Sequence, residues 1–158
     1  MSNIQRATTS IPSIYRFLLL NVESLFALGG VFLVLTNPGQ YNSSLTHNTP
    51  RSIQPNTDFI YTQLAGGWAF IAFTEAVVLR LVDDVKVWRL LCAGILLSDA
   101  LYTHSLAQAL GGWPEWVKVG QWTGEDWLVA ATTWPFVLTR VAIVLGIGFR
   151  KQDLAKRA

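Results

Sequence analysis

The sequence predicts an all-α fold, a bundle of four transmembrane helices, from its composition and its apolar stretches. Of the 158 residues, 51% are hydrophobic and 14% are charged, whereas a soluble domain carries roughly 25% charged residues. Four stretches reach the roughly 20 apolar residues that span a bilayer, and none alternates with the period of membrane β-strands. We expect one integral membrane domain, residues 1–158, with spans at about 14–35, 59–82, 87–110 and 127–149.

The segments between these stretches fit four helices in series. Residues 36–58 are polar and rich in proline and glycine, which is typical of an ordered loop. The turn at Asp83-Asp84 is short, so the second and third spans are expected to pack as an antiparallel pair, with the two acids solvated. Residues 111–125 hold three tryptophans, which favour the headgroup region. We therefore expect this segment to lie along the membrane surface.

The distribution of lysine and arginine predicts the orientation. The chain ends and the second connection carry Arg6, Arg16, Arg80, Lys86, Arg89, Arg150, Lys151, Lys156 and Arg157, whereas the first and third connections carry Arg51 and Lys118. The positive-inside rule then places the N- and C-termini in the cytoplasm. The sequon Asn42-Ser43-Ser44 falls on the opposite side, which predicts glycosylation of Asn42. We expect the membrane to be that of the endoplasmic reticulum.

Four ionisable residues stand well inside the spans, one in each: Glu23, Glu75, Asp99 and Arg140. A charge at mid-bilayer costs roughly 2.5–3.5 kcal/mol on insertion scales, and all four lie about 10–20 Å from the predicted cytoplasmic ends. One interpretation is a structural ion network; the other is a polar chamber. Three carboxylates against one arginine leave at least one acid without a full partner, and a buried unpaired acid stays protonated and able to donate its proton.

Aromatic residues accompany these acids at helical spacing. Tyr61, Trp68 and Glu75 recur at seven-residue intervals in the second span, and Tyr102 shares a helix face with Asp99 in the third. Each ring taken singly is expected to serve packing, but together the rings and acids predict a pocket with an aromatic wall. Aromatic faces stabilise a nearby cation.

Other sequence features bear on the packing of the spans and on the kinds of enzyme site that the chain could contain. Gly29-Gly30 would let another helix approach the first span closely, and Pro135 is expected to kink the fourth span before Arg140. The single cysteine, Cys92, is expected to be buried and inert. The sequence has no phosphate-binding loop, zinc-protease motif, nucleophile elbow or dinucleotide fingerprint. We therefore expect no metal and no cofactor.

Several sequence runs resemble a family of small fungal four-span membrane proteins. They are 11–16 leading to Glu23, 63–65 leading to 74–80, and 87–89 leading to Asp99. The resemblance covers about residues 11–149. Some small fungal membrane proteins of this type are similar to the non-canonical terpene cyclases of meroterpenoid pathways, although the better-known cyclases are longer and have more spans.

That resemblance implies an enzyme of secondary metabolism, a proton-initiated cyclase or isomerase without a metal. Such cyclases protonate the epoxide of a prenylated, lipophilic substrate with a buried acid, and the carbocation then cyclises against an apolar, aromatic wall. By this resemblance Glu75 or Asp99, and after them Glu23, would be the acid, and Arg140 would orient it and also bind substrate. Tyr61, Trp68 and Tyr102 would shape the substrate pocket.

Two other functions stay open from the sequence. The chain could be a non-catalytic protein that binds lipid or a partner, with structural buried charges, or a small transporter or proton relay, which four spans without a visible inverted repeat disfavour unless the chain forms a homo-oligomer. The expected partners are a lipophilic small molecule and membrane lipid. The small net charge of +2 argues against nucleic acid.

Overall fold

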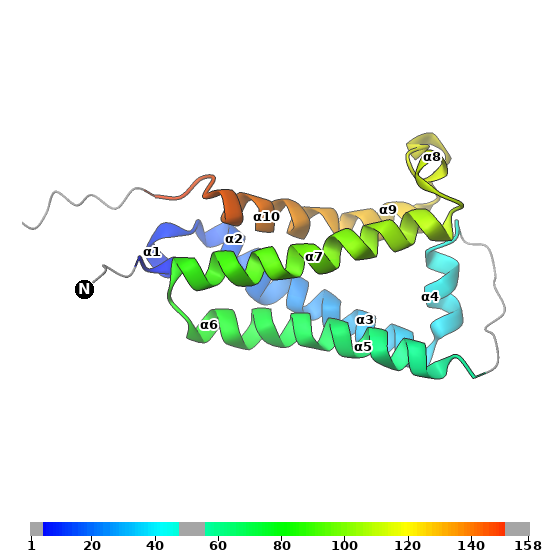
Figure 1. The fold of residues 1–158 in the computed structure, drawn as a ribbon, viewed down its shortest axis with the longest axis horizontal. Helices are drawn as coiled ribbons and strands as arrows, with labels where there is room; N and C mark the ends of the chain where they lie inside the picture. The colour runs from blue at the N-terminus through cyan, green and yellow to red at the C-terminus, as the bar shows by residue number, and fades with distance from the viewer. Residues whose placement is uncertain (1–4, 48–55, 151–158) are drawn as a thin grey trace, which may run out of the picture.

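The computed structural model describes residues 5–47 and 56–150, and within these ranges the chain forms helices and no strand. Four helical segments are long and apolar enough to cross a membrane: Ser13–Thr36, Asp58–Leu81, Val85–Ala109 and Gly124–Leu145. They run side by side along the long axis of the molecule (Figure 1). The predicted all-α fold with four spans is confirmed, and the chain is an integral membrane protein. Arg51, Lys151, Lys156 and Arg157, which contributed to the predicted orientation, lie outside the described residues.

The first span contains a widened turn in its middle. It follows the short helix α1 (Ala7–Ser10) and consists of α2 (Ser13–Phe17), the π-helical segment η1 (Leu18–Glu23) and α3 (Ser24–Thr36). The buried hydroxyl of Ser24 donates to the carbonyl oxygen of Leu19 at 3.0 Å, which gives a carbonyl group of the widened turn a further partner. Short π-helical segments of this kind are rare and occur frequently at functional sites.

The second span repeats this construction. It consists of α5 (Asp58–Phe73), the π-helical segment η2 (Thr74–Val78) and α6 (Leu79–Leu81). Residues 18–23 of the first span and 74–78 of the second lie against each other. The bundle therefore has two widened turns at the same depth.

The third span is the continuous helix α7 (Val85–Ala109). The side chain of Asp84 accepts a hydrogen bond from the backbone N–H of Lys86 at 2.7 Å, which caps the first turn of this helix. Its neighbour Asp83 accepts from both the backbone N–H and the hydroxyl of Thr8, at 2.7 and 2.9 Å. The two acids of the predicted solvated turn thus have specific partners, one in α7 and one in α1.

The fourth span is interrupted, and the expected kink at Pro135 is the start of a new helix. Helix α9 (Gly124–Ala131) ends before α10 (Trp134–Leu145) begins, and Pro135 lies in the first turn of α10, where its missing N–H is tolerated. Gly146 has a φ of 73° and terminates α10 in the left-handed conformation. The span therefore ends at Leu145 rather than at the predicted residue 149.

Short helices occupy the connections at one end of the bundle. Helix α4 (Pro38–Ser44) lies across that end, inside the segment predicted as a loop, and α8 (Trp113–Trp116) extends beyond it (Figure 1). A short 3₁₀ turn, Val119–Gln121, follows α8. Around it the rings of Trp113, Trp116, Trp122 and Trp127 contact one another in sequence, with centroids 5.1–5.9 Å apart.

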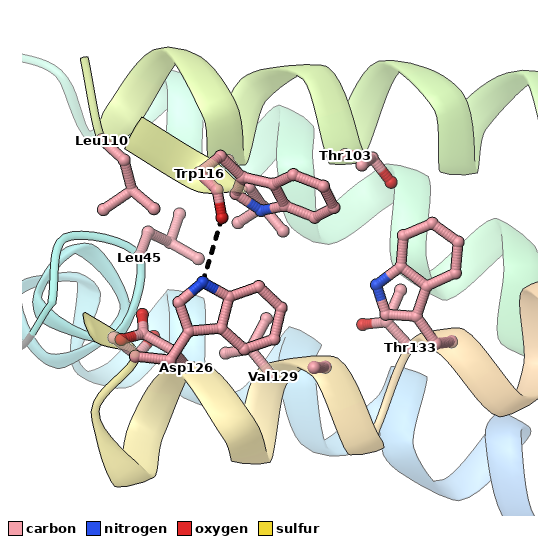
Figure 2. A pocket seen from close by; sticks show the side chains of 12 residues that line it. Leu45, Thr103, Leu110, Trp116, Asp126, Val129 and Thr133 are labelled. Carbon is pink, nitrogen blue, oxygen red and sulfur yellow. Dashed lines mark hydrogen bonds between the residues drawn. The ribbon is translucent and has the colours of Figure 1, made fainter. Parts of the chain in front are cut away.

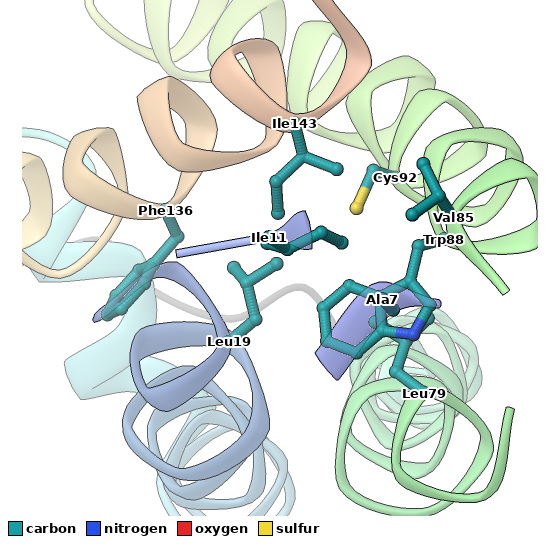
Figure 3. Close-up of a cluster of buried hydrophobic side chains, with 9 residues drawn as sticks. All are labelled: Ala7, Ile11, Leu19, Leu79, Val85, Trp88, Cys92, Phe136 and Ile143. Atoms are coloured by element: carbon teal, nitrogen blue, oxygen red, sulfur yellow. The ribbon is translucent and has the colours of Figure 1, made fainter. Parts of the chain in front are cut away.

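The spans pack as two pairs, α3 with α5 and α7 with α10, so the predicted close pairing of the second and third spans is wrong. A buried apolar core joins the pairs at the end of the bundle where α1 and the C-terminal end of α10 both lie (Figures 1 and 3). This core contains the following side chains: Ala7, Ile11, Leu19, Leu79, Val85, Trp88, Cys92, Phe136 and Ile143. The thiol of Cys92 is buried in it, as predicted. Packing between the pairs is therefore concentrated at one end of the molecule.

Gly30 offers a test of the close packing between α3 and α5. A Cβ atom at Gly30 would lie 2.5 Å from the ring of Trp68, whereas a Cβ at Gly29 would meet nothing within 4 Å. We expect Gly30→Ala to lower the free energy of unfolding by about 1–3 kcal/mol, because the ring must move. Gly29→Ala should leave it unchanged or raise it by up to about 1 kcal/mol. Thermal unfolding of both variants in detergent measures the difference, and equal midpoints would contradict the assigned packing.

The contact between Thr8 and Asp83 predicts a pH dependence. Partial burial opposes ionisation of Asp83, but the two hydrogen bonds from Thr8 and the nearby charge of Arg6 hold its pKa below the usual value. A depressed pKa means that the contact stabilises the fold above the ordinary pKa of about 4 and loses its effect as the pH falls through the lower, folded-state value. The thermal midpoint of the native chain should therefore exceed that of Asp83→Asn at pH 7, and the gap should close near pH 3. A constant gap would contradict this assignment.

Candidate functional site

The four intramembrane charges meet in one cluster, although they come from four different spans. Arg140 in α10 donates from Nη1 to Oδ2 of Asp99 in α7 at 2.6 Å. Its Nη2 donates to Oε1 of Glu75 in η2 at 3.1 Å and also to Oε1 of Glu23 in η1. The side chains of Arg140 and Glu75 are 1% and 0% exposed. One guanidinium group therefore holds one acid from each of the other three spans.

The local helix geometry explains why two of the acids converge. Glu23 is the last residue of η1, and Glu75 is the second residue of η2. A π-helical turn contains an additional residue, so it rotates the side chains that follow relative to a regular helix. Because these two segments lie against each other, both carboxyl groups point toward the space that the side chain of Arg140 fills.

The cluster has more negative than positive groups. Oε2 of Glu23, Oε2 of Glu75 and Nε of Arg140 are buried and have no hydrogen-bond partner among the described residues. If all three acids were ionised, two negative charges would lack a counterion in a low-dielectric interior, which is strongly unfavourable. The arrangement therefore favours a state in which protons neutralise part of the cluster.

A cavity of about 370 Å³ lies beside the cluster and extends toward α4. Residues of all four spans line it, and Glu23 and Asp99 form its inner end. Glu75 and Arg140 do not reach its surface, because they lie behind those two acids. Of the three acids that the sequence singled out, two therefore face a space that could hold a ligand.

The wall of the cavity is aromatic, and Trp68 is at its centre. The ring of Trp68 contacts those of Tyr41 and Tyr102 edge to face, with centroids 5.5 and 6.4 Å away. All three residues line the cavity. Trp68 and Tyr102 thus line the cavity, and their role in substrate binding stays a prediction.

Two other residues predicted to bind substrate lie elsewhere. Arg140 is enclosed behind the acids, and Tyr61 is not among the lining residues. The hydroxyl of Tyr61 instead accepts a hydrogen bond from Nδ2 of Asn42 at 2.6 Å, which links α4 to α5. Nδ2 is also the atom that glycosylation of Asn42 would modify, and that modification stays a prediction.

Tyr41 is a lining residue that the sequence reasoning missed. It belongs to α4, a helix of 7 residues within the predicted loop, where no periodicity signals an inward face. The available signal was Asn37-Pro38, because asparagine favours the N-cap and proline the first helical turn; the side chain of Asn37 indeed accepts from the backbone N–H of Gln40 at 3.1 Å. Burial raises the pKa of the Tyr41 hydroxyl above its usual value, so it is neutral at physiological pH.

The outer end of the cavity is polar and covered by α4. Gln40, Ser44 and Glu125 line this end. Just beyond α4, Nδ1 of His47 lies 2.7 Å from Oδ2 of Asp126, which is also bound to Thr123 in the capping box of α9. The cavity therefore has an acidic inner end, an aromatic wall and a polar outer end.

A second, smaller pocket lies nearer to the tryptophan cluster (Figure 2). It has a volume of about 30 Å³ and is bordered by Trp116, Trp122 and Asp126, among others. The indole N–H of Trp122 donates to the backbone carbonyl of Trp116 at 3.0 Å across it (Figure 2). This volume suits a water molecule and excludes an organic ligand, so the larger cavity is the candidate site.

The acids of the cluster are arranged around a guanidinium group and not around a space for an ion. In the described part of the chain, no group of three or more histidine, cysteine, aspartate or glutamate side chains is placed to hold a metal. The chemistry that the arrangement itself offers is proton transfer from a carboxyl group into an apolar, aromatic space.

A family model described as a domain of unknown function (DUF7704) matches residues 8–150. The match covers all four spans and every residue of the cluster and cavity, and the chain belongs to this family. No curated protein and no solved structure matches the chain.

Proposed function

We propose that this member of the DUF7704 family is a membrane-bound, terpene cyclase-like enzyme of secondary metabolism. It protonates the epoxide of a prenylated, lipophilic intermediate and directs cyclisation of the resulting carbocation. One observation carries the proposal: the carboxyl groups of Asp99 and Glu23 form the inner end of an aromatic cavity between membrane-spanning helices. No metal or cofactor takes part in the proposed step.

The dimensions and composition of the cavity support a lipophilic substrate. Its volume of about 370 Å³ lies within the roughly 300–1,000 Å³ of small-molecule sites. The polar outer end at Gln40 and Glu125 suits the hydroxylated head of an amphiphile, and the prenyl chain would extend inward to the acids. The proposed substrate would thus place its terminal epoxide at Asp99.

We assign Asp99 as the proton donor. Glu23 and Glu75 each have one carboxyl oxygen that is buried and unpaired, and a proton on that enclosed atom would not reach a ligand. Asp99 has no such enclosed oxygen. Oδ2 of Asp99 is bound to Arg140, and the side chains of Asp99 and Glu23 are exposed to a similar extent at the cavity wall, 14% and 13%, so the enclosed oxygen of Glu23 is what distinguishes the two acids. A proton on the carboxyl group of Asp99 is therefore held by a fixed side chain within reach of a ligand. A positioned acid of this kind typically contributes about 10²- to 10⁴-fold to a rate.

The reaction is a balanced isomerisation. The carboxyl proton of Asp99 passes to the epoxide oxygen, and the bond from that oxygen to the more substituted carbon breaks, leaving a hydroxyl group and a carbocation. The π electrons of a neighbouring double bond then form the new carbon–carbon bond. The final carbocation loses a proton to a carboxylate of the cluster, so the cluster regains the proton it gave up. The faces of Trp68 and Tyr102 would stabilise the cationic intermediates.

In this mechanism Glu75 and Arg140 are positioning residues. Arg140 donates hydrogen bonds to Asp99 and Glu23, and it also donates to Glu75, which does not line the cavity. This assignment differs from the role of acid that the family resemblance suggested for Glu75, because a fully enclosed carboxyl group would have to move to meet a substrate.

We further propose that the protein resides in the endoplasmic reticulum with its ends in the cytoplasm. The described basic residues Arg6, Arg16, Arg80, Lys86, Arg89 and Arg150 belong to the end of the bundle that holds α1. The positive-inside rule supports a cytoplasmic location for that end. The polar mouth of the cavity, under α4, would then face the lumen.

A non-catalytic, lipid- or partner-binding membrane protein is the second candidate. The observation that favours it is the sharing of Arg140 by three acids from three spans. Such a network could serve only to fix how the helices assemble, with the cavity occupied by lipid. This alternative predicts a bound amphiphile and no turnover.

The test is product formation by the intact chain. Expressed in a heterologous fungal host and fed epoxidised farnesyl-phenols, the protein should yield an isomer of equal mass and shorter retention on a reversed-phase column, detected by mass spectrometry. Membranes from the host without the gene are the control. Recovery of unchanged epoxide from cells that contain well-folded protein, across phenols of varied head group, would favour the second candidate.

A further inference from the structure

The residues that line the large cavity carry negative groups and no positive ones. Three lining residues are acids, Glu23, Asp99 and Glu125, and no lysine, arginine or histidine of the described chain is among the lining residues. Within residues 5–47 and 56–150, the one cation in contact with this set is Arg140, which lies behind the wall and is shared with Glu75. Protons can neutralise part of this imbalance, and a cationic ligand can do so in their place, whereas an uncharged or anionic ligand cannot.

The enclosed part of the cluster also has more acid groups than cations, because Arg140 is shared by three acids. Glu75 is fully buried, and its Oε2 has no hydrogen-bond partner among the described residues. Oε2 of Glu23 is in the same state. A positive charge at the inner end of the cavity would interact favourably with these carboxyl groups through a low-dielectric medium. Oε2 of Glu75 adds to the acids that face the cavity, because Glu75 itself does not line it.

The aromatic wall selects the type of cation. The rings of Tyr41, Trp68 and Tyr102 form a continuous row along the cavity, and tryptophan has the ring face that attracts cations most strongly. A metal ion would need several converging ligands, and no group of three or more histidine, cysteine, aspartate or glutamate side chains in the described residues is placed to hold one. An alkylated ammonium group, which has a large radius and an apolar surface, fits both the rings and the acids.

We propose that this cavity binds a lipophilic organic cation, an ammonium group carried on an apolar chain. The charged group lies between Asp99 and Glu23 against Trp68, and the chain runs along the wall toward α4. This site goes beyond the cyclisation proposed above, because binding requires no epoxide and no turnover. If the protein is a cyclase, the same ligand occupies the position of the carbocation and inhibits it.

The experiment is photolabelling of the full chain in an uncharged maltoside detergent. The probe is decyltrimethylammonium with a diazirine in its chain, and the labelled residues are located by mass spectrometry. The competitors are unlabelled decyltrimethylammonium and its neutral isostere, in which a carbon atom replaces the nitrogen. We expect saturable labelling of cavity residues, and the cation should compete at least about ten times better than the isostere.

Matched amide variants test the role of charge. Asp99→Asn and Glu23→Gln should each weaken binding of the probe severalfold, whereas Glu115→Gln should not, because Glu115 is paired with Lys118 outside the cavity. Thermal unfolding confirms that each variant is folded, and if neither cluster variant folds, Trp68→Leu serves in their place. Equal competition by cation and isostere, or labelling only of lipid-facing residues, would overturn the proposal. Cation binding without any cyclised product would contradict the proposed enzymatic function and still support this binding site.

Discussion

Asp99→Asn is expected to lower the rate of product formation by about 10²- to 10⁴-fold, which is the usual contribution of a positioned general acid. Asparagine keeps the size of the side chain and an oxygen that accepts from Arg140, but it has no acidic proton. The substrate should still bind, because the cavity wall is unchanged. Single-turnover measurements on purified protein in nanodiscs would separate the two effects: the rate constant should fall while the concentration for half-saturation stays within a few fold.

Two variants give this prediction its controls. Asp58→Asn makes the same chemical change in the first turn of α5, where the residue is exposed and does not line the cavity, and it should leave the rate unchanged. Glu75→Gln alters the enclosed part of the cluster, so its effect on the rate should be smaller than that of Asp99→Asn. A fully active Asp99→Asn protein would contradict the assignment of Asp99 as the proton donor. If Glu75→Gln were the inactive variant, the proton would have to come from Glu75.

Arg140→Met is expected to destabilise the folded bundle by about 3–5 kcal/mol, the typical result of removing one partner from a buried ion pair. Methionine matches much of the volume of arginine but leaves three carboxyl groups without a cation. Since Arg140 binds groups in all three other spans, its loss should also loosen the contact between the helix pairs. Thermal unfolding in detergent, together with the fraction of monodisperse protein after extraction, measures both effects.

The matched control removes a positive charge elsewhere. Lys86→Met lies at the exposed start of α7, where only the backbone N–H of Lys86 is bound by Asp84. It should change the free energy of unfolding by no more than about 0.5 kcal/mol, as surface substitutions usually do. If Arg140→Met were as stable as Lys86→Met, the cluster would not hold the spans together, and the second candidate function would lose its main support.

Much of the fold could be predicted from the sequence because hydrocarbon imposes strong constraints. A segment that crosses a bilayer must satisfy its backbone groups internally, so a long apolar stretch becomes a helix whatever its neighbours are. The four spans follow from this rule, with ends that differ by a few residues where a local signal such as Gly146 stops the helix. The four intramembrane charges could also be identified, since each is rare in such a context.

Details of the helices were harder to predict because competing local effects decide them. The interruption of the fourth span before Pro135 and the short helix α4 depend on caps and first-turn residues within otherwise ambiguous segments. The two π-helical segments have no recognisable sequence pattern here, yet they hold Glu23 and Glu75. A regular 3.6-residue period predicted one stripe for Tyr61, Trp68 and Glu75; Tyr61 and Trp68 do pack against one apolar cluster, whereas Glu75 lies in the ion network.

The sequence by itself thus determined the all-α membrane fold, the four charges and the presence of aromatic residues near them, because transfer into lipid depends on composition and helical length. Only the tertiary structure decided that Arg140 is shared by all three acids, that Asp99 and Glu23 face a cavity while Glu75 does not, and that Tyr41 closes the aromatic wall. These relations depend on how the two helix pairs meet and on the rotation that the π-helical turns introduce. Contacts between residues 117 positions apart, such as Glu23 and Arg140, leave no trace in the local pattern of a single sequence.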